Sequence, residues 1–490
     1  MNIPGGVGSN GFARNRVSRQ WNPGLDSMGG AWPRQSVCSV PGGWGIMQTM
    51  KHPILVRALF LIPVLLFNRS TADAQPLTPV ESAVVQAVDT GVPRYLKLLE
   101  TTVNINSGTL NQDGVSRVGQ VLAKEFEALG FSTRWVDGSE WGRAGHLIAE
   151  REGDADAPRV LLIGHLDTVF EPDSPFQTYE LLDADSARGP GTTDMKGGNL
   201  IMLLALEALI RADALPGYGI TAILTGDEEK PGRPLALARR DLMELADRAD
   251  IVLGFEDGDG DPATAVIARR GSTGWKLVTT GAAAHSSQIF REDVGYGAVY
   301  EAARVLDGFR RELAGEANLT FNPGVILGGT EVTFDRGASA GTAFGKSNVI
   351  AEEVVVAGDL RTLTPEQLDR ARKAMERIVA DHLPGTGGSI TFGDGYPPMA
   401  PTEGNRRLLA MFDQASRDLG FGPVAAVDPA RAGAADISFT AGRVDMALDG
   451  LGLMGSGGHT ERETADLRTL PIQAKRVALV LLRLETGPQR

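Results

Sequence analysis

The chain has 490 residues, of which 42% are hydrophobic and 22% are charged. That balance is typical of a globular protein, and the length exceeds what one hydrophobic core usually organises, so we expect two domains. The formal net charge of -13 argues against a nucleic-acid backbone or an anionic membrane surface as partner.

The N-terminal region has the pattern of a secretory signal. Met50-Lys51-His52-Pro53 precedes an apolar run from Ile54 to Phe67, and Ala72-x-Ala74 follows it. A basic start, a short apolar stretch and small residues before a cleavage point predict removal before Gln75. The run is shorter than the roughly 20 residues that span a bilayer. We expect residues 1–74 to be a leader and the mature protein to be periplasmic or secreted, with an uncleaved anchor as the alternative.

Residues 1–46 are rich in Gly, Pro and Arg and precede that signal, which indicates an overextended start with Met47 or Met50 as the true initiator. The single cysteine, Cys38, lies in the same segment. Cleavage would therefore leave no thiol, which excludes disulfides and thiolate ligands. Any metal ligands must then be His, Asp or Glu.

From residue 84 the apolar residues follow a helical period to residue 99 and again from 115 to 129. Runs with little polar alternation then alternate with a helix. The predicted strands are 146–149, 160–163, 220–225 and 251–255, and the predicted helix is 199–212. This order predicts an α/β domain with a mainly parallel mixed sheet flanked by helices. In such sheets, sites form beyond the C-terminal ends of the strands.

The pattern changes near residue 269. Residues 275–280 alternate like a half-exposed strand, and 348–361 are strand-like. Residues 295–313 and 365–383 have helical periodicity. We therefore predict an inserted α+β domain at 269–393, within a first domain formed by 75–268 and 394–490.

Five acidic or histidine-bearing segments lie at or just after apolar runs, four of them close to predicted strand ends. His165 and Asp167 follow the strand 160–163 and project to the same side. That spacing lets the Asp167 carboxylate accept a hydrogen bond from the far ring nitrogen of His165, which is a common support for a metal-binding histidine. The alternative is a polar strand end with a satisfied histidine.

Asp194 precedes Lys196-Gly197-Gly198 and a densely apolar helix. It could cap that helix, or its two oxygens could bridge two cations. The Gly-Lys-Ser/Thr pattern of a phosphate loop is missing.

Glu228 and Glu229 follow the strand 220–225. Adjacent carboxylates diverge, so one can bind a metal while the other acts as general base; an acidic surface turn is the alternative. Glu256 follows the strand 251–255, with Asp257 as the rival ligand, and His459 lies in a glycine-rich segment.

The remaining histidines divide into two groups. His52, His146 and His382 are interpreted as structural or incidental, and His285 is undecided from spacing alone. Buried strand ends that carry several carboxylates and imidazoles imply a compensating positive charge. Metal dications supply it, because they bind ionised carboxylates and neutral imidazoles.

Taken together, these motifs resemble the dizinc peptidase and deacylase family, which includes bacterial glutamate carboxypeptidase, aminoacylase and succinyl-diaminopimelate desuccinylase. The motifs occur in order and the resemblance covers nearly all of the chain after residue 75. Its likeness to the secreted glutamate carboxypeptidase extends to the leader. The segments that carry it are 164–169, 189–198, 227–230, 255–256 and His459.

The resemblance implies two Zn²⁺ ions per subunit, with cobalt or manganese as alternatives that the same ligands accept. Glu228 would be the general base and Asp167 would orient His165. Two cations about 3.5–4 Å apart would acidify a shared water and polarise an amide carbonyl. The implied ligands are His165 and Glu256 for one ion, Glu229 and His459 for the other, and Asp194 for both.

The resemblance also implies that the insert is a lid and dimerisation domain. His285 would reach the partner subunit's cleft to stabilise an oxyanion, and Asn348 and Arg361 would hold the substrate's carboxylate. Without the resemblance, Arg361 is at least equally well interpreted as a surface arginine at a strand end. The chain departs from its relatives at Ser286-Ser287, at Gly297 and in the segment 431–435, which leaves substrate specificity open.

We therefore expect a zinc-dependent amidohydrolase of carboxypeptidase type that releases a C-terminal amino acid, glutamate first, from a small peptide or N-acyl amino acid. The nearest alternative is an N-acyl-amino-acid deacylase or a dipeptidase of the same family. A catalytically silent metal-binding or scaffolding protein is the alternative from another class. Glu228 beside a full ligand set weighs against it.

Overall fold

The computed structural model describes residues 74–154, 157–215 and 217–484. The predicted signal and the start-codon prediction fall at residues 1–73, outside the described residues. Within the described ranges, no helix is both long and apolar enough to cross a membrane.

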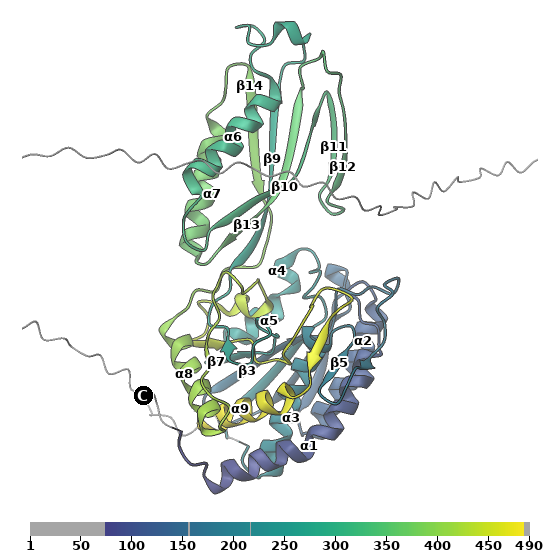
Figure 1. The fold of residues 1–490 in the computed structure, drawn as a ribbon, viewed down its shortest axis with the longest axis vertical. Coiled ribbons are helices and arrows are strands. Elements are labelled where there is room, and N and C mark those ends of the chain that lie inside the picture. The colour runs from purple at the N-terminus through teal and green to yellow at the C-terminus, as the bar shows by residue number, and fades with distance from the viewer. Residues whose placement is uncertain (1–73, 155–156, 216, 485–490) are drawn as a thin grey trace, which may run out of the picture. The chain divides into compact units, whose positions relative to one another are not determined.

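A six-stranded sheet forms the centre of the larger domain (Figure 1). Strands β6, β3, β7 and β16 run parallel to one another. Strand β2 pairs antiparallel with β6, and β1 pairs antiparallel with β2 at the edge of the sheet. The prediction of a mainly parallel mixed sheet flanked by helices is confirmed. In sheet order, the strands are β1 (Ser132–Asp137), β2 (Gly145–Arg151), β6 (Gly219–Thr225), β3 (Arg159–His165), β7 (Ile251–Gly254) and β16 (Met446–Leu448).

Both faces of this sheet are covered, which explains the continuous apolar run of β3. Val160 and Leu162 belong to a core shared with helices α1, α2, α3 and α9, whereas Leu161 and Ile163 pack with α5 and neighbouring segments. Alternate residues of a strand face opposite sides, so both sets must be apolar when both sides are buried. The helices are α1 (Pro79–Val103), α2 (Gln112–Ala128), α3 (Gly197–Arg211), α4 (Leu235–Ala238), α5 (Arg240–Ala246), α8 (Glu403–Asp418) and α9 (Thr469–Leu484).

Helix α3 is apolar around nearly its whole circumference because it contacts α1, α9 and β3. Every residue from Gly197 to Leu209 is buried. Gly198 is required at its first turn, since a Cβ there would lie 1.9 Å from the carbonyl oxygen of Phe255. The start of α3 is therefore pressed against the end of β7, and this close approach positions the loop that precedes the helix.

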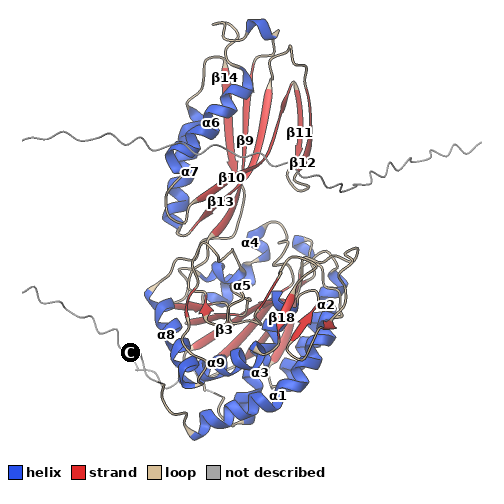
Figure 2. Ribbon diagram, in the orientation of Figure 1, coloured by secondary structure: helices blue, strands red, loops and turns tan. Residues whose placement is uncertain are grey.

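The insert has its own antiparallel sheet, in the order β10-β13-β9-β14, and its own core (Figure 2). Strand β9 alternates buried and half-buried residues, as its sequence pattern indicates. The inner residues pack on helices α6 (Gly297–Leu313) and α7 (Pro365–Ala380). The strands are β9 (Gly271–Gly281), β10 (Thr320–Gly329), β13 (Glu353–Thr362) and β14 (Thr386–Phe392). The domain boundaries 269 and 393 stay a prediction.

Several shorter strands complete the structure. Strands β11 and β12 form a hairpin within the insert. Exposed residues alternate with half-buried ones in β11, and all residues of β12 are exposed. The sequence analysis did not predict this hairpin. The short strands are β4 (Glu180–Leu181), β5 (Ser186–Arg188), β8 (Thr264–Ala265), β11 (Glu331–Asp335), β12 (Ala340–Phe344), β15 (Ala425–Ala426), β17 (Gly455–Ser456) and β18 (Thr464–Asp466).

Candidate metal centre

Two histidines face the two oxygens of one carboxylate. Nε2 of His165 lies 3.0 Å from Oδ1 of Asp194, and Nε2 of His459 lies 2.9 Å from Oδ2. Each histidine also faces a glutamate: Oε1 of Glu256 is 3.7 Å from His165, and Oε2 of Glu229 is 3.1 Å from His459. Asp194 thus stands between two sets, each of one histidine and one glutamate.

The sheet brings these side chains together. His165 is the last residue of β3, whereas Glu229 and Glu256 follow β6 and β7, which are the two parallel neighbours of β3. The C-terminal ends of three adjacent parallel strands meet at one edge, where open α/β sheets form their sites. Asp194 comes from the loop before α3, and His459 from the loop between β17 and β18.

The donor set fits divalent metal ions. One ligand atom each from His165, Asp194 and Glu229 lies within 4.8 Å of the others. Among the described residues, the ion pairs of Asp194, Glu229 and Glu256 are with histidines and include no lysine or arginine. Carboxylates this poorly exposed need a positive charge, and imidazole with carboxylate is a set that zinc, cobalt and manganese accept.

The proton equilibria of the cluster reflect this crowding. Burial would raise the pKa of Asp194, but hydrogen bonds from His165 and His459 hold that pKa well below its usual range. The hydrogen bonds that His459 makes with Asp194 and Glu229 raise the pKa of His459 to about 11. Burial and the charge of Asp194 raise the pKa of Glu229 to about 7. His459 and Glu229 therefore hold protons more readily than usual, and a cation that binds these side chains would release those protons.

Asp167 makes more contacts than its spacing suggested. Nδ1 of His165 lies 3.0 Å from the Asp167 carbonyl oxygen and 3.4 Å from the carboxylate Oδ1. A carbonyl only accepts, so Nδ1 carries the proton and Nε2 of a neutral ring is free to bind a cation. The expected contact with the carboxylate is the longer of the two, and the orienting role of Asp167 stays a prediction.

The Asp167 carboxylate also binds the backbone of the neighbouring glutamates. Its oxygens accept hydrogen bonds from the backbone amides of Glu228 at 3.0 Å and Glu229 at 3.1 Å. The hydroxyl of Thr109 donates to Oδ2 at 2.6 Å. Asp167 is fully buried, so these bonds fix the backbone of the glutamate pair relative to the end of β3.

Two hydrogen bonds, one to the amide and one to the carbonyl, fix the backbone of Glu228. Its amide donates to Asp167, and its carbonyl accepts a hydrogen bond of 2.9 Å from the Tyr396 hydroxyl. Burial raises the pKa of the Glu228 carboxyl well above its usual value, and the charges of Glu256 and Asp436 raise it further. A raised pKa suits a group that takes and returns a proton near neutral pH, although a bound cation would lower it.

A buried arginine, Arg239, that the sequence analysis did not predict joins Asp227, which precedes Glu228, to Asp436. Arg239 is fully buried and donates to Asp436 through Nε and to Asp227 through Nη1, both at 2.6 Å. Its Nη2 donates to the Tyr396 hydroxyl at 2.8 Å. The Arg239 guanidinium thus links the strand end beneath Glu228 to the segment that returns from the insert. Asp227 beside the two glutamates was the only sequence signal for this network.

A second buried arginine supports Glu256. Nε of Arg269 donates to Oδ2 of Asp449 at 2.7 Å, and Oδ1 of Asp449 accepts from the Glu256 amide at 3.3 Å. Arg269 also pairs through its backbone with Met399 in both directions, at 2.9 Å. Spacing alone gave no signal for Asp449, because it acts through a backbone amide.

The predicted substrate residues have contacts within the insert. Nδ1 of His285 lies 2.8 Å from the Ser287 hydroxyl. The amide of Ser286 donates to the carbonyl of Asn348 at 2.9 Å, so the segments of His285 and Asn348 are neighbours. Nε of Arg361 donates to Asp359 at 2.6 Å. The roles predicted for His285, Asn348 and Arg361 involve a substrate and a second subunit, and they stay predictions.

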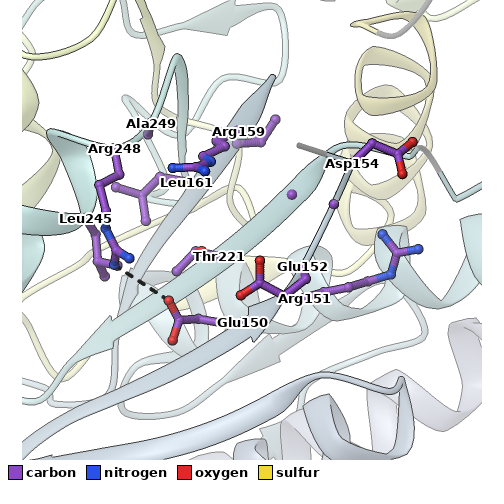
Figure 3. A pocket seen from close by; sticks show the side chains of 13 residues that line it. Glu150, Arg151, Glu152, Asp154, Arg159, Leu161, Thr221, Leu245, Arg248 and Ala249 are labelled. Atoms are coloured by element: carbon purple, nitrogen blue, oxygen red, sulfur yellow. Dashed lines mark ion pairs between the residues drawn. The ribbon is translucent and has the colours of Figure 1, made fainter. Parts of the chain in front are cut away.

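A surface hollow, seen from close by in Figure 3, lies at the end of β3 opposite to His165. Arg159, the first residue of β3, lines this hollow. Glu150 and Arg248 line it too, and they form an ion pair with each other at 3.7 Å. Arg159 and His165 are the first and last residues of β3, six residue steps apart, or roughly 20 Å at about 3.3 Å per step. This hollow is therefore not part of the metal-binding cluster. A different surface hollow is lined by His459 itself, together with Phe170, Ser174 and Arg462 among others.

Comparisons with known proteins show what this chain is similar to. The profile described as Peptidase family M20/M25/M40 matches residues 161–483. Carboxypeptidase G2 from Pseudomonas sp. (strain RS-16) is 26% identical over 445 residues, which are 89% of this chain and 100% of that protein. A succinyl-diaminopimelate desuccinylase from Delftia acidovorans is 24% identical over 305 residues, which are 59% of this chain and 73% of the relative.

Solved structures show the same fold at lower identity. Aminopeptidase PepT from Bacillus cereus superposes with a TM-score of 0.64 at 19% identity, over 80% of this chain and 98% of that one. An M20 family metallo-carboxypeptidase from Sulfolobus solfataricus has a TM-score of 0.58 at 14% identity, over 80% of this chain and 99% of that one.

Proposed function

Because the chain belongs to peptidase family M20/M25/M40, we propose that this metallopeptidase is a dizinc carboxypeptidase that releases a C-terminal amino acid, glutamate first, from a small peptide or N-acyl amino acid. The observation that carries the proposal is the placement of Asp194 between His165 and His459, at 3.0 and 2.9 Å. The carboxypeptidase type is supported by the similarity to carboxypeptidase G2 along the whole of that relative.

In this proposal His165 and Glu256 would hold one zinc ion, Glu229 and His459 would hold the other, and Asp194 would be a ligand of both. Ions held there would supply Lewis-acid chemistry, which polarises an amide carbonyl and makes water more acidic.

The chain's own groups handle the proton. The Glu228 carboxylate takes it from the attacking water and returns it to the departing amine, which restores the carboxylate. Asp167 and Tyr396 keep the Glu228 backbone in place during both transfers through its amide and its carbonyl.

A substrate panel tests the proposal. N-acyl-glutamates, other N-acyl amino acids and free dipeptides would be assayed with the zinc-loaded protein, before and after a chelator. Hydrolysis of acyl-glutamates that the chelator abolishes and zinc restores supports the proposal. Activity confined to dipeptides or other acyl amino acids would favour the deacylase or dipeptidase alternative. Inactivity on every amide would favour a non-catalytic metal-binding protein.

The proposal extends to a homodimer formed through the insert, in which His285 completes the partner's site. Mixing Glu228→Gln and His285→Ala proteins tests this. In a mixed dimer, the subunit that keeps Glu228 would receive His285 from its partner, so activity should return although each variant alone is weak. Failure of the mixture to recover activity, with dimers shown by sedimentation, would exclude sharing of His285.

The proposal also includes cleavage of the leader and a periplasmic or secreted mature protein. It is supported by the sequence pattern before Gln75 alone. Sequencing the N-terminus of the mature protein should give Gln75 as the first residue. A start upstream of the apolar run would show that the leader is retained.

A further inference from the structure

The carboxylate of Glu463 lies inside the loop that carries Asp194. Oε1 of Glu463 accepts hydrogen bonds from the amides of Thr193 at 2.8 Å and Asp194 at 3.2 Å, and Oε2 accepts from the Gly191 amide at 2.9 Å. The hydroxyls of Thr192 and Thr193 lie 3.4 and 3.3 Å from Oε1. Glu463 is fully buried.

These bonds explain how a buried carboxylate is tolerated here. A charge removed from water needs either an opposite charge or several hydrogen bonds. No arginine or lysine forms an ion pair with Glu463 in the described part of the chain, and three backbone amides converge on its oxygens instead. The hydrogen bonds therefore act on the backbone of residues 191–194, which sets the origin of the Asp194 side chain.

Glu463 also ends the loop that carries His459. Its amide donates to the Thr460 carbonyl at 3.0 Å, and the Thr460 amide donates to the Gly457 carbonyl at 3.1 Å. The next residues form β18, which pairs with β17 before the loop and with β5 on its other side. The backbone of Glu463 thus closes the His459 loop while its side chain fixes the Asp194 loop.

We propose that Glu463 is a positioning residue for the metal centre, which locks the loops of Asp194 and His459 together so that the pair is formed before a cation binds. This inference rests on the proposed function, because it assigns the loop geometry to metal binding. It predicts a defect in metal affinity, whereas a general packing role predicts only a loss of stability.

The chain offers a matched control. Glu301 in the insert is also fully buried, and its carboxylate accepts from the Leu383 amide at 2.9 Å and the Thr386 hydroxyl at 3.1 Å. Those partners are in the insert, as is Arg304, with which Glu301 forms an ion pair. Glu301→Gln therefore removes a comparable buried charge without touching residues 191–194.

The experiment titrates Zn²⁺ into the chelator-treated parent, Glu463→Gln and Glu301→Gln by calorimetry, and follows amide hydrogen exchange of residues 191–194 without metal. A glutamine presents an amide group where one oxygen accepted, so Glu463→Gln should exchange faster at these amides. It should bind the weaker zinc ion about 10- to 100-fold less tightly, the usual effect of removing a group that supports a metal ligand. Excess zinc should restore kcat, with KM unchanged.

Three results separate the outcomes. Equal zinc affinity and equal exchange in the parent, Glu463→Gln and Glu301→Gln would overturn the inference. A parent that binds no zinc would instead overturn the proposed function. If Glu463→Gln does not fold, Glu463→Asp keeps the charge but withdraws it by one methylene, and the same loss of affinity is expected of it; parent-like affinity would contradict the inference.

Discussion

Asp194 and His459 are separated in sequence by the whole insert, yet Nε2 of His459 lies 2.9 Å from Oδ2 of Asp194. The other oxygen of Asp194 faces His165. A carboxylate that presents one oxygen to each of two imidazoles is the arrangement expected of a ligand shared by two cations. The contact depends on the loops on which the two residues lie, and those loops are joined by Glu463.

Replacing Glu228 should remove turnover while leaving the metal ions bound. Glu228→Gln keeps the shape of the side chain but cannot take a proton, and general acid–base groups contribute about 10²- to 10⁴-fold. We expect kcat to fall by that factor and metal content by elemental analysis to match the parent. Glu353→Gln, in the insert, serves as control. A variant that loses its metal as well would make Glu228 a ligand instead.

Metal binding should release protons and strengthen as pH rises. The pKa of His459 is raised to about 11 and that of Glu229 to about 7 in the absence of cations, so at pH 6 both side chains are mostly protonated. Cations bind the unprotonated forms, so apparent affinity should increase from pH 6 to pH 8.

Calorimetry in two buffers of different ionisation enthalpy measures this release. At least about one proton per chain should be released when metal binds at pH 7. His382→Ala, a histidine of the insert, should leave the number unchanged. Heats that are independent of the buffer would contradict the assignment of these side chains as ligands.

Removing Arg239 should destabilise the larger domain strongly. Arg239→Met leaves Asp227 and Asp436 buried without their counter-charge, and breaking a buried pair costs about 3–5 kcal/mol. The free energy of unfolding in urea measures this loss. Arg468→Met removes the exposed pair with Asp466, for which about 0–1 kcal/mol is expected. Similar losses in the two variants would show that the buried network contributes little.

Tyr396→Phe should slow the reaction without changing metal content. The ring would still pack on Phe439, but Glu228 would lose the hydrogen bond to its carbonyl and Arg239 would lose an acceptor. A hydrogen bond of about 0.5–1.5 kcal/mol that acts on the base predicts a fall in kcat of about 2- to 13-fold. Tyr300→Phe, half exposed on α6, is the control. Unchanged kcat in Tyr396→Phe would show that Glu228 is placed by Asp167 alone.

The candidate residues at strand ends were predictable from sequence, because a sequence pattern combines with a rule of sheet topology. The apolar runs before His165, Glu228 and Glu256 identify buried parallel strands, and such strands end at one edge of the sheet. His459 and Asp194 lie on loops without a comparable pattern, and their assignment depended on the family resemblance.

The supporting residues were not predictable, because they act through tertiary contacts. Arg239, Arg269 and Glu463 are charged residues in unremarkable local sequence, and only the fold shows that each is buried against the backbone or side chains of the cluster. Glu463 follows His459 closely in sequence, which was the one local signal available. The β11–β12 hairpin was not predicted: β11 does alternate polar and apolar residues, but β12 is exposed along its whole length and its sequence has no such alternation.

The most direct test of the account is the zinc content of the purified parent and of Asp194→Ala, measured together with amide hydrolysis. The account predicts two zinc ions per chain in the active parent, and loss of at least one ion and of nearly all turnover in the variant. A parent that hydrolyses its substrate without bound metal, or an Asp194→Ala protein as active as the parent, would contradict it.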